Sequence, residues 1–244
     1  MPSKFNQAPN YQDLFKFIAI ISMIIDHYGI FIHNVSWLRL VGRIAMPFFC
    51  FFAGYNYYRI KSEQKIIFCF QILKYKKLTL IGIILQFLHI IFIPELSFLN
   101  IILSIIISLS FIDLSEKYRI SSWFFNVLLI VLIPFSYEVY DYGTIGTGFV
   151  YLGYVARLQR NIMYRNLVAM WSVVLLMFSS GQFSNLEIII LFIISIGFFY
   201  IFSFVNFEQR LQFKPLLISR YVLEIFCVQY ILFILIHGIK LHSI

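Results

Sequence analysis

The stretch IIDHYGIF (residues 24–31), followed after a short loop by WLRLVGRIAMPFFCFF (residues 37–52), decides how this sequence can fold. Both segments are apolar enough to enter a lipid bilayer, yet between them they carry Asp26, His27, Arg39 and Arg43. An ionisable side chain in the hydrocarbon costs about 3 kcal/mol or more, so such residues usually mark a functional site. We therefore expect these four residues to form the centre of a site embedded in the membrane.

The composition of the chain is that of a membrane protein. Its 244 residues are 61% hydrophobic and only 12% charged, whereas soluble domains average roughly 45–50% apolar residues. Because lipid can cover the excess apolar surface, we expect residues 1–244 to form a single integral membrane domain that begins with a polar tail at residues 1–13. The net charge of +8 is scattered along the chain, which favours a role in membrane orientation over binding to nucleic acid.

Long apolar runs set the fold class. A spanning helix needs roughly 20 apolar residues, with a range of about 17–25. By that rule the sequence predicts an all-α, polytopic transmembrane helical bundle with about nine spanning helices: Leu14–Phe31, Leu38–Tyr58, Leu78–Phe92, Phe98–Leu114, Trp123–Phe135, Thr144–Leu158, Leu167–Phe178, Leu186–Phe204 and Tyr221–Ile239. The run Ile66–Leu73 is too short to span and is flanked by lysines, so it predicts a short interfacial helix.

The distribution of Lys and Arg gives the bundle a direction. With the N-terminus in the cytoplasm, every loop follows the positive-inside rule. All of the 19 basic residues except Arg39, Arg43 and Lys240 then fall on the inner side. This topology places Asp26 and His27 in the outer half of the first span, and the two arginines in the outer half of the second.

Two further polar residues share that depth. Asp141 and Tyr142, in the stretch YDYGTIG, lie where the sixth span begins, again on the outer side. Features that are far apart in the chain are thus expected to converge on one side of the membrane.

His27 is the first candidate for chemistry. A neutral imidazole takes and returns a proton near neutral pH, which makes it a common general base for acyl transfer to an amine or hydroxyl. The alternative is a buried histidine that only bridges two helices through hydrogen bonds. Asp26 is its neighbour in sequence, and neighbours on a helix point about 100° apart, so the two side chains do not form a ready-made dyad.

Arg39 and Arg43 have two interpretations. An unpaired carboxylate in a membrane is costly, so Asp26 is expected to pair with Arg43 or Arg39 across the interface between the first two helices. The arginines can also hold phosphate groups or polarise a carbonyl. The sequence alone favours neither.

Metal and hydrolase chemistry find no support in the sequence. Cys50, Cys69 and Cys227 lie apart in apolar surroundings without the paired spacing of a zinc site, so we expect them to be packing residues. The sequence contains no HExxH or CxxC pattern and no Ser-His-Asp order. We therefore expect no metal.

Four blocks, in this order, resemble the TraX family: DLFKFIAIISMIIDHYG, WLRLVGRIAMPFFCFFAGY, LNIILSIIISL and DYGTIGTG. The resemblance runs from about residue 13 to about residue 235. This family of polytopic bacterial membrane proteins is named for the enzyme that acetylates the N-terminus of conjugative F-type pilin. It is distantly similar to membrane acyltransferases in which a histidine on an early helix works with cytosolic acetyl-CoA to modify an acceptor on the far side.

The resemblance carries over residue by residue. Asp26 and His27 match the first block of the family pattern. The second block is matched by Arg39, Gly42, Arg43 and Pro47, and the DYG block by Asp141, Tyr142 and Gly143. The sequence departs from the family pattern at two places. FFAGYNYYR has no acidic residue near Gly54, and CVQY places Tyr230 where the family tends to have a histidine.

The resemblance thus implies an acyltransferase of the bacterial inner membrane. Acetyl-CoA would be the co-substrate, membrane lipids the surroundings, and a pilin-like protein or an envelope glycan the acceptor. His27 and Asp26 would be catalytic, whereas Arg39, Arg43, Asp141, Tyr142 and Tyr230 would bind substrate. The alternative is a membrane transporter or an assembly factor for a surface structure, without enzymatic activity.

Overall fold

A computed structural model describes residues 8–29, 32, 36–64, 76–92, 99–136, 139, 142–158, 161–180 and 184–242. Within these ranges the regular structure is helical, and Asn10 and Arg210 form an isolated β-bridge. The expected all-α class is therefore confirmed for the part of the chain that the structure describes. The chain divides into two compact units, Met1–Phe49 with Gln182–Ile244, and Cys50–Gly181.

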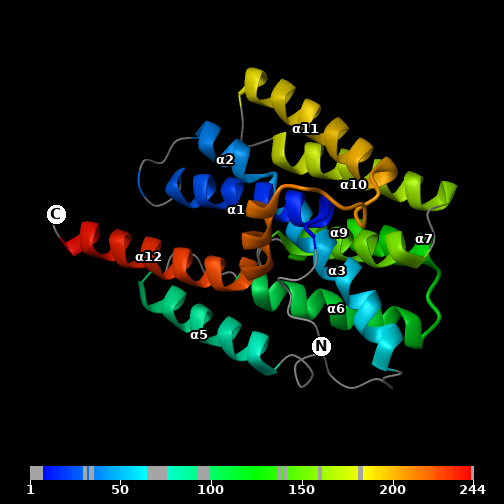
Figure 1. The fold of residues 1–244 in the computed structure, drawn as a ribbon, viewed down its shortest axis with the longest axis horizontal. Coiled ribbons are helices and arrows are strands. Elements are labelled where there is room, and N and C mark those ends of the chain that lie inside the picture. Colours follow the sequence, from blue (N-terminus) through cyan, green and yellow to red (C-terminus); the bar gives the residue numbers. More distant parts are fainter. Residues whose placement is uncertain are drawn as a thin grey trace. The chain divides into compact units, whose positions relative to one another are not determined.

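The first unit contains α1 (Tyr11–Tyr28), α2 (Ser36–Gly42), α11 (Asn185–Phe204), the 3-10 helix η3 (Lys214–Tyr221) and α12 (Val222–His242). Within it, α1 packs against α2, η3 and α12 (Figure 1). Helix α3 (Ala45–Gln64) begins in this unit and continues into the second. The second unit contains α5 (Lys76–Phe92), α6 (Ile101–Lys117), α7 (Ser122–Val131), α8 (Ile133–Ser136), α9 (Gly143–Leu158) and α10 (Ile162–Ser180).

The first turn of α1 is satisfied by two sets of hydrogen bonds. Asn10 caps the helix in a capping box, in which its Oδ1 accepts from the backbone N–H of Asp13 and its own N–H donates to Asp13 Oδ2. The N–H groups of Tyr11 and Gln12 have no partner within the helix, as at any helix start. They donate instead to the backbone carbonyls of Gln209 and Phe207, respectively. A late segment of the chain thus completes the start of α1.

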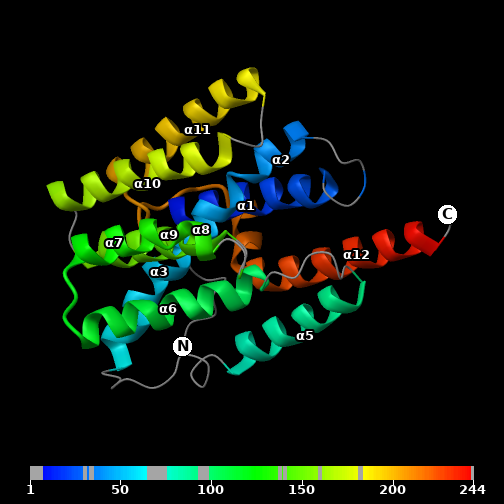
Figure 2. The same cartoon turned by 180° about the vertical axis from the view of Figure 1, so that it is seen from behind.

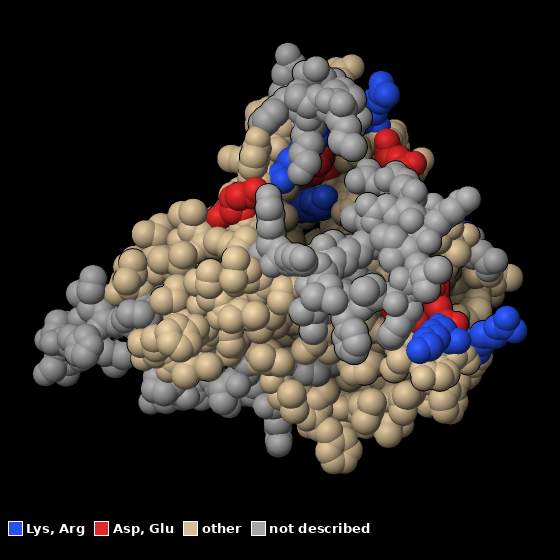
Figure 3. Space-filling view, turned by 90° about the horizontal axis from the view of Figure 1, so that it is seen from below, with Lys and Arg blue, Asp and Glu red and all other residues tan. Residues whose placement is uncertain are grey.

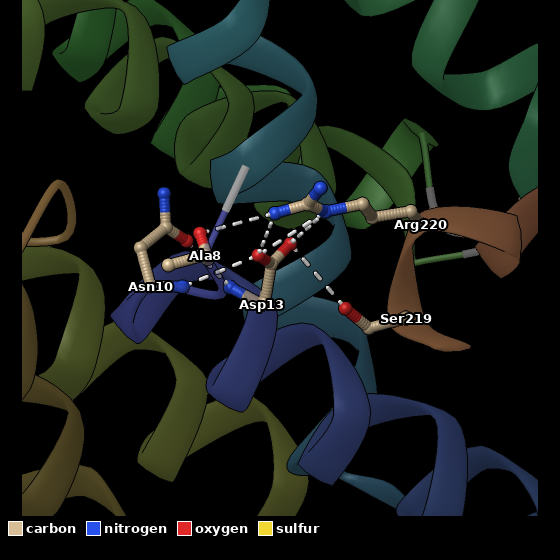
Figure 4. Close-up of polar contacts among 5 residues, drawn as sticks. All are labelled: Ala8, Asn10, Asp13, Ser219 and Arg220. Carbon is tan, nitrogen blue, oxygen red and sulfur yellow. Dashed lines mark hydrogen bonds and ion pairs between the residues drawn. The ribbon is translucent and has the colours of Figure 1, made fainter. Parts of the chain in front are cut away.

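Asp13 also joins α1 to the segment that precedes α12 (Figure 4). Arg220 Nη2 lies 2.9 Å from Asp13 Oδ2 and also donates to the carbonyl oxygen of Ala8 at 3.4 Å. The hydroxyl of Ser219 donates to Asp13 Oδ1 at 3.5 Å. Asp13 is only 5% exposed, so its charge depends on these partners. The sequence placed Asp13 in the polar tail, whereas the structure places it in the first turn of α1.

Five phenylalanines fill the core of the first unit beside this contact. Phe15 of α1 stacks on Phe48 with 5.1 Å between ring centroids, and Phe48 meets Phe198 and Phe202 of α11 edge-on at 5.3 and 5.5 Å. Phe207 closes the cluster against Phe15 at 5.9 Å. Offset and edge-on ring pairs of this kind add to the free energy of apolar burial. The cluster therefore packs α11 and the start of α3 against α1.

The expected second span is two helices rather than one. Helix α2 ends at Gly42, residues 43 and 44 form a turn, and α3 begins at Ala45. Pro47 has no N–H to donate to the carbonyl of Arg43 four residues earlier, and its ring crowds that carbonyl. Pro47 thus accounts for the break at Arg43, and the proline itself is tolerated in the first turn of α3.

Helix α9 is the central helix of the second unit (Figure 2). It contacts α6, α7, α8 and α10, and every residue from Gly143 to Tyr154 is buried. Two polar pairs cross this unit: the hydroxyls of Ser108 and Thr147 lie 2.8 Å apart, and Trp171 Nε1 donates to Asn126 Oδ1 at 2.7 Å. These pairs satisfy polar groups that would otherwise be buried without hydrogen bonds.

Helices α3 and α9 touch backbone to backbone. A Cβ atom at Gly54 would overlap the carbonyl oxygen of Val150, and a Cβ atom at Gly153 would overlap the carbonyl oxygen of Phe51. Small residues allow this close approach, which is a common way for helices to associate in membranes. Gly54 of the FFAGY stretch is therefore a helix-packing residue.

The helices agree in position with the expected spans, although fewer of them meet the requirements of a span. Three described segments are long and apolar enough to cross a membrane: Trp37–Tyr58, Asn185–Phe204 and Pro215–Phe233. Leu78–Leu88, Ser122–Val131 and Ile162–Met177 are shorter apolar helices. The count of nine spans, their orientation and the single domain stay predictions. The interfacial helix at Ile66–Leu73 lies outside the described residues.

The surface of these helices is suited to lipid. On α11, Leu186, Ile193 and Tyr200 are 70%, 62% and 62% exposed. Acidic and basic side chains are few among the described residues on the face shown in Figure 3. Apolar exposure on this scale marks a surface that something apolar must cover, and lipid does so along a spanning helix. The structure thus supports an integral membrane protein.

We predict that the ion pair between Asp13 and Arg220 is a main support of the first unit. Asp13→Ala should lower the free energy of unfolding by about 3 kcal/mol, because it leaves a guanidinium without its carboxylate in a largely buried place. The measurement is unfolding of the purified protein in detergent, with Arg210→Ala as the control, since Arg210 is exposed. In a double-mutant cycle with Arg220→Met, additive losses would show that the pair does not couple.

We also predict that the contact between α3 and α9 tolerates no side chain. Gly153→Ala should destabilise the protein by about 1–3 kcal/mol, because the obstacle is a backbone carbonyl that cannot rotate away. Gly197→Ala is the matched control, since a Cβ atom there meets nothing within 4 Å. Equal melting temperatures for the two variants in detergent would contradict the close contact.

Candidate functional site

The predicted site residues of the first unit lie on α1, α2, α12 and the turn after α2. Asp26 and His27 are adjacent near the C-terminal end of α1, and successive residues of a helix point about 100° apart. As a result Asp26 faces α2, whereas His27 faces α12. The two side chains therefore serve different helix interfaces, as their spacing in the sequence predicts.

Three aromatic rings and one amide of α12 surround His27. Its ring centroid lies 6.3 Å from that of Phe226, 5.7 Å from that of Tyr230 and 6.0 Å from that of Phe233. Gln229 Nε2 lies 2.7 Å from His27 Nδ1. His27 is thus an imidazole with a specific polar partner in an otherwise aromatic setting. Such a setting lets a ring hold a defined orientation.

Gln229 is the site residue that sequence reasoning missed. It is 7% exposed, and its Nε2 also donates to the backbone carbonyl of Met23 at 3.2 Å. Its Oε1 is buried and finds no hydrogen-bond partner in the described part of the chain. The available signal was an amide inside the apolar run VLEIFCVQYILF, since a buried amide requires partners.

Tyr230 lies beside His27, with ring centroids 5.7 Å apart. It is 6% exposed, and its ring stacks on Phe226 with centroids 5.5 Å apart and planes 17° apart. Tyr230 therefore contributes a wall of the His27 site. A tyrosine in this place offers a hydroxyl and an apolar ring, whereas the histidine of the family pattern would offer a second titratable group.

Asp26 lies against the small residue that ends α2. A Cβ atom at Gly42 would overlap the Asp26 side chain, so glycine at this position lets α2 approach the carboxylate. The guanidinium charges of Arg43 and Arg39 both act on Asp26, and that of Arg43 does so more strongly. Arg43 is 8% exposed, and Arg39 is half-buried. The expected pairing of Asp26 with Arg43 or Arg39 stays a prediction.

The remaining predicted site residues belong to the second unit. Tyr142 is half-buried just before α9, with a left-handed φ of 61°, and Gly143 follows with a φ of 51°. Two successive left-handed residues form a tight turn, which explains a glycine at the second position. Tyr142 accepts the first hydrogen bond of α9 from the N–H of Gly146. Asp141 lies outside the described residues.

The second unit also contains a cavity of about 320 Å³ between the ends of α6, α7, α9 and α10. Its polar lining includes Glu116, Arg119, Tyr154 and Asn161. The Tyr154 hydroxyl donates to Glu116 Oε1, and Arg119 has a left-handed φ of 51° where the chain leaves α6. Acidic and basic groups thus share this cavity. Among the described residues, no three His, Cys, Asp or Glu side chains come together as metal ligands.

Comparison with known proteins places the chain in a family. The family model of the TraX protein matches residues 11–228. An uncharacterized protein of Rickettsia prowazekii (strain Madrid E) is 31% identical over 238 residues, which cover 91% of this chain and 90% of that protein. The probable fimbrial assembly protein FimC, serogroup H1, of Dichelobacter nodosus is 39% identical over 57 residues, which cover 21% of this chain and 23% of that protein. No solved structure matches the chain.

The family model spans α1 to the middle of α12, and therefore includes Asp26, His27, Arg39 and Arg43. The resemblance of the four sequence blocks is thereby confirmed over nearly the whole chain. The protein is a member of the TraX family.

Proposed function

We propose that this protein is an integral membrane acyltransferase that moves an acetyl group from acetyl-CoA to an amine or hydroxyl acceptor. The acceptor reaches the site from the outer side of the inner membrane, and acetyl-CoA comes from the cytoplasm. The observation that carries this proposal is the placement of His27 against Gln229 and Tyr230 in the unit that also holds Asp26, Arg39 and Arg43. A protonatable ring with a fixed polar partner can serve as the general base of acyl transfer, and arginines in the same unit can stabilise the oxyanion.

His27 acts as the general base in this proposal. The acceptor nitrogen or oxygen attacks the thioester carbon as His27 takes its proton, so that a bond from carbon to nitrogen or oxygen forms. The bond from carbon to sulfur then breaks, and the proton passes from His27 to the departing thiolate. Every proton is accounted for by one imidazole, and neither a metal nor an oxidant is required.

Arg43 and Arg39 supply positive charge next to Asp26. Where Asp26 balances one guanidinium, the other remains to attract a phosphate of CoA or the oxyanion that forms on the acyl carbon. Asp26 in turn fixes the position of the arginines across the interface between α1 and α2. We propose these roles from the position of Asp26 against Gly42, at the end of the helix that carries Arg39 and directly precedes Arg43.

A pilin-like protein is the acceptor that we favour, with an envelope glycan as the alternative. Membership of the TraX family is consistent with a pilin-related function. A second function, assembly of a surface filament without catalysis, is favoured by the likeness to a probable fimbrial assembly protein over 57 residues. The two functions differ in whether acetyl-CoA binds and reacts.

Replacement of His27 tests the proposed chemistry. In membranes given acetyl-CoA with a labelled acetyl group, His27→Asn should lower transfer at least about 100-fold, because an amide cannot take the proton. Asparagine still offers Gln229 an acceptor, so the variant is expected to fold. Its melting temperature in detergent checks this. Gly197→Ala, prepared and assayed in the same way, is the control variant and should transfer at the wild-type rate. Transfer at that rate by a folded His27→Asn variant would refute the role of His27.

Binding of acetyl-CoA separates the enzyme from the assembly factor. A ligand that binds only the folded state raises its stability, by about 2.7 kcal/mol at a concentration of 100 times Kd. We expect acetyl-CoA and CoA to raise the melting temperature of the purified protein in detergent, and Arg39→Met with Arg43→Met to weaken that shift. Arg210→Ala removes one positive charge at an exposed position elsewhere and should retain the shift. No shift in the wild-type protein would favour the assembly factor.

A further inference from the structure

The amide of Gln229 is held between two acceptors. Its Nε2 lies 3.2 Å from the carbonyl oxygen of Met23 and 2.7 Å from His27 Nδ1. All three residues belong to the first unit, with Met23 and His27 one helical turn apart on α1. Gln229 therefore reaches from α12 to one face of α1.

The carbonyl of Met23 decides which end of the amide faces α1. A carbonyl oxygen only accepts hydrogen bonds, so the atom of Gln229 beside it must be a donor. An amide nitrogen carries two hydrogens and has no lone pair to offer. With one hydrogen directed at Met23, the second is directed at His27 Nδ1. Both donors of Gln229 are then used.

This arrangement settles where the proton of a neutral His27 resides. Because Nδ1 receives a hydrogen bond, Nδ1 holds the lone pair, and the ring proton is on Nε2. The nitrogen that can take a proton is therefore the nitrogen that Gln229 covers. In the other tautomer the lone pair is on Nε2 and the proton is on Nδ1. Gln229 would then have to accept a hydrogen bond from Nδ1–H through its side-chain oxygen, and this oxygen would face the carbonyl oxygen of Met23.

The other end of the amide has no hydrogen-bond partner among the residues that the structure describes. Gln229 Oε1 is buried without one, and a buried acceptor left unsatisfied is costly. It belongs to the same planar group as the nitrogen that touches His27, so an acceptor bound beside the ring would contact it. An amine or hydroxyl is a donor that would satisfy it.

We infer that Gln229 is a positioning residue for acyl transfer. One N–H of its amide holds the ring of His27 with the proton on Nε2, and its carbonyl oxygen receives the N–H or O–H of the acceptor. The catalytic meaning of this inference rests on the proposed function. When the acceptor binds Oε1, the amide shifts from Nδ1, and the acceptor's proton moves to the lone pair that this exposes. The same Nδ1 later returns that proton to the thiolate, and Gln229 covers it again.

Nitrogen NMR of the histidine-labelled wild-type protein in detergent tests the tautomer without any need for activity. The signals of His27, identified by their loss in His27→Asn, should show Nδ1 unprotonated and Nε2 carrying the proton at a pH where the ring is neutral. In Gln229→Glu the carboxylate can only accept, so the proton should move to Nδ1. Val228→Ala changes the exposed neighbour on the same helix and should leave the tautomer as it is.

Transfer kinetics supply the second measurement. Gln229→Met should lower kcat by about 10- to 100-fold through loss of orientation and raise KM for the acceptor, with KM for acetyl-CoA unchanged. A proton on Nδ1 in the wild-type protein, or an unchanged tautomer in Gln229→Glu, would overturn the inference. If the wild-type protein shows the expected tautomer but transfers no acetyl group, the proposed function fails and the arrangement of Gln229 stands.

Discussion

The ion pair between Asp13 and Arg220 is the constraint on which the first unit depends. Asp13 is also the residue that completes the capping box of α1, so one buried carboxylate both begins a helix and binds the segment before another. Backbone hydrogen bonds from Tyr11 and Gln12 to residues 207–209 reinforce the same contact. The two ends of the chain are thereby joined through groups whose separation would leave charge and N–H donors buried without partners.

A second contact between α1 and α12 then becomes possible farther along both helices. The ion pair fixes η3 against the start of α1, and the hydrogen bond from Gln229 to His27 connects α12 with the end of α1. Two contacts along a pair of rigid helices define their relative rotation as well as their distance. The orientation of the His27 ring is therefore a property of the whole unit, and it is set in part by a charge pair in another turn of the helix.

The sequence predicted the helices well because long apolar runs are a local signal, and it predicted the divergence of Asp26 and His27 because helical geometry is fixed. It did not predict the partners of Asp13 or His27. Arg220 and Gln229 are more than 200 residues away in the chain, and which face of α12 meets α1 is decided by packing. The sequence predicted one span over Leu38–Tyr58, but the hydrogen bond that Pro47 cannot make to Arg43 separates two helices. Asp141 and Ile66–Leu73 lie outside the described residues, so those predictions stay open.

The crossing of α3 and α9 has a consequence for how the family can vary. At most core positions a larger residue on one helix can be accommodated by a smaller one on its neighbour, so the two positions change together. Gly54 and Gly153 each face a carbonyl oxygen of the opposite backbone, and no substitution alters a backbone atom. Neither position can compensate for the other. Sequence drift in this protein should therefore leave both glycines in place while the side chains around them change freely.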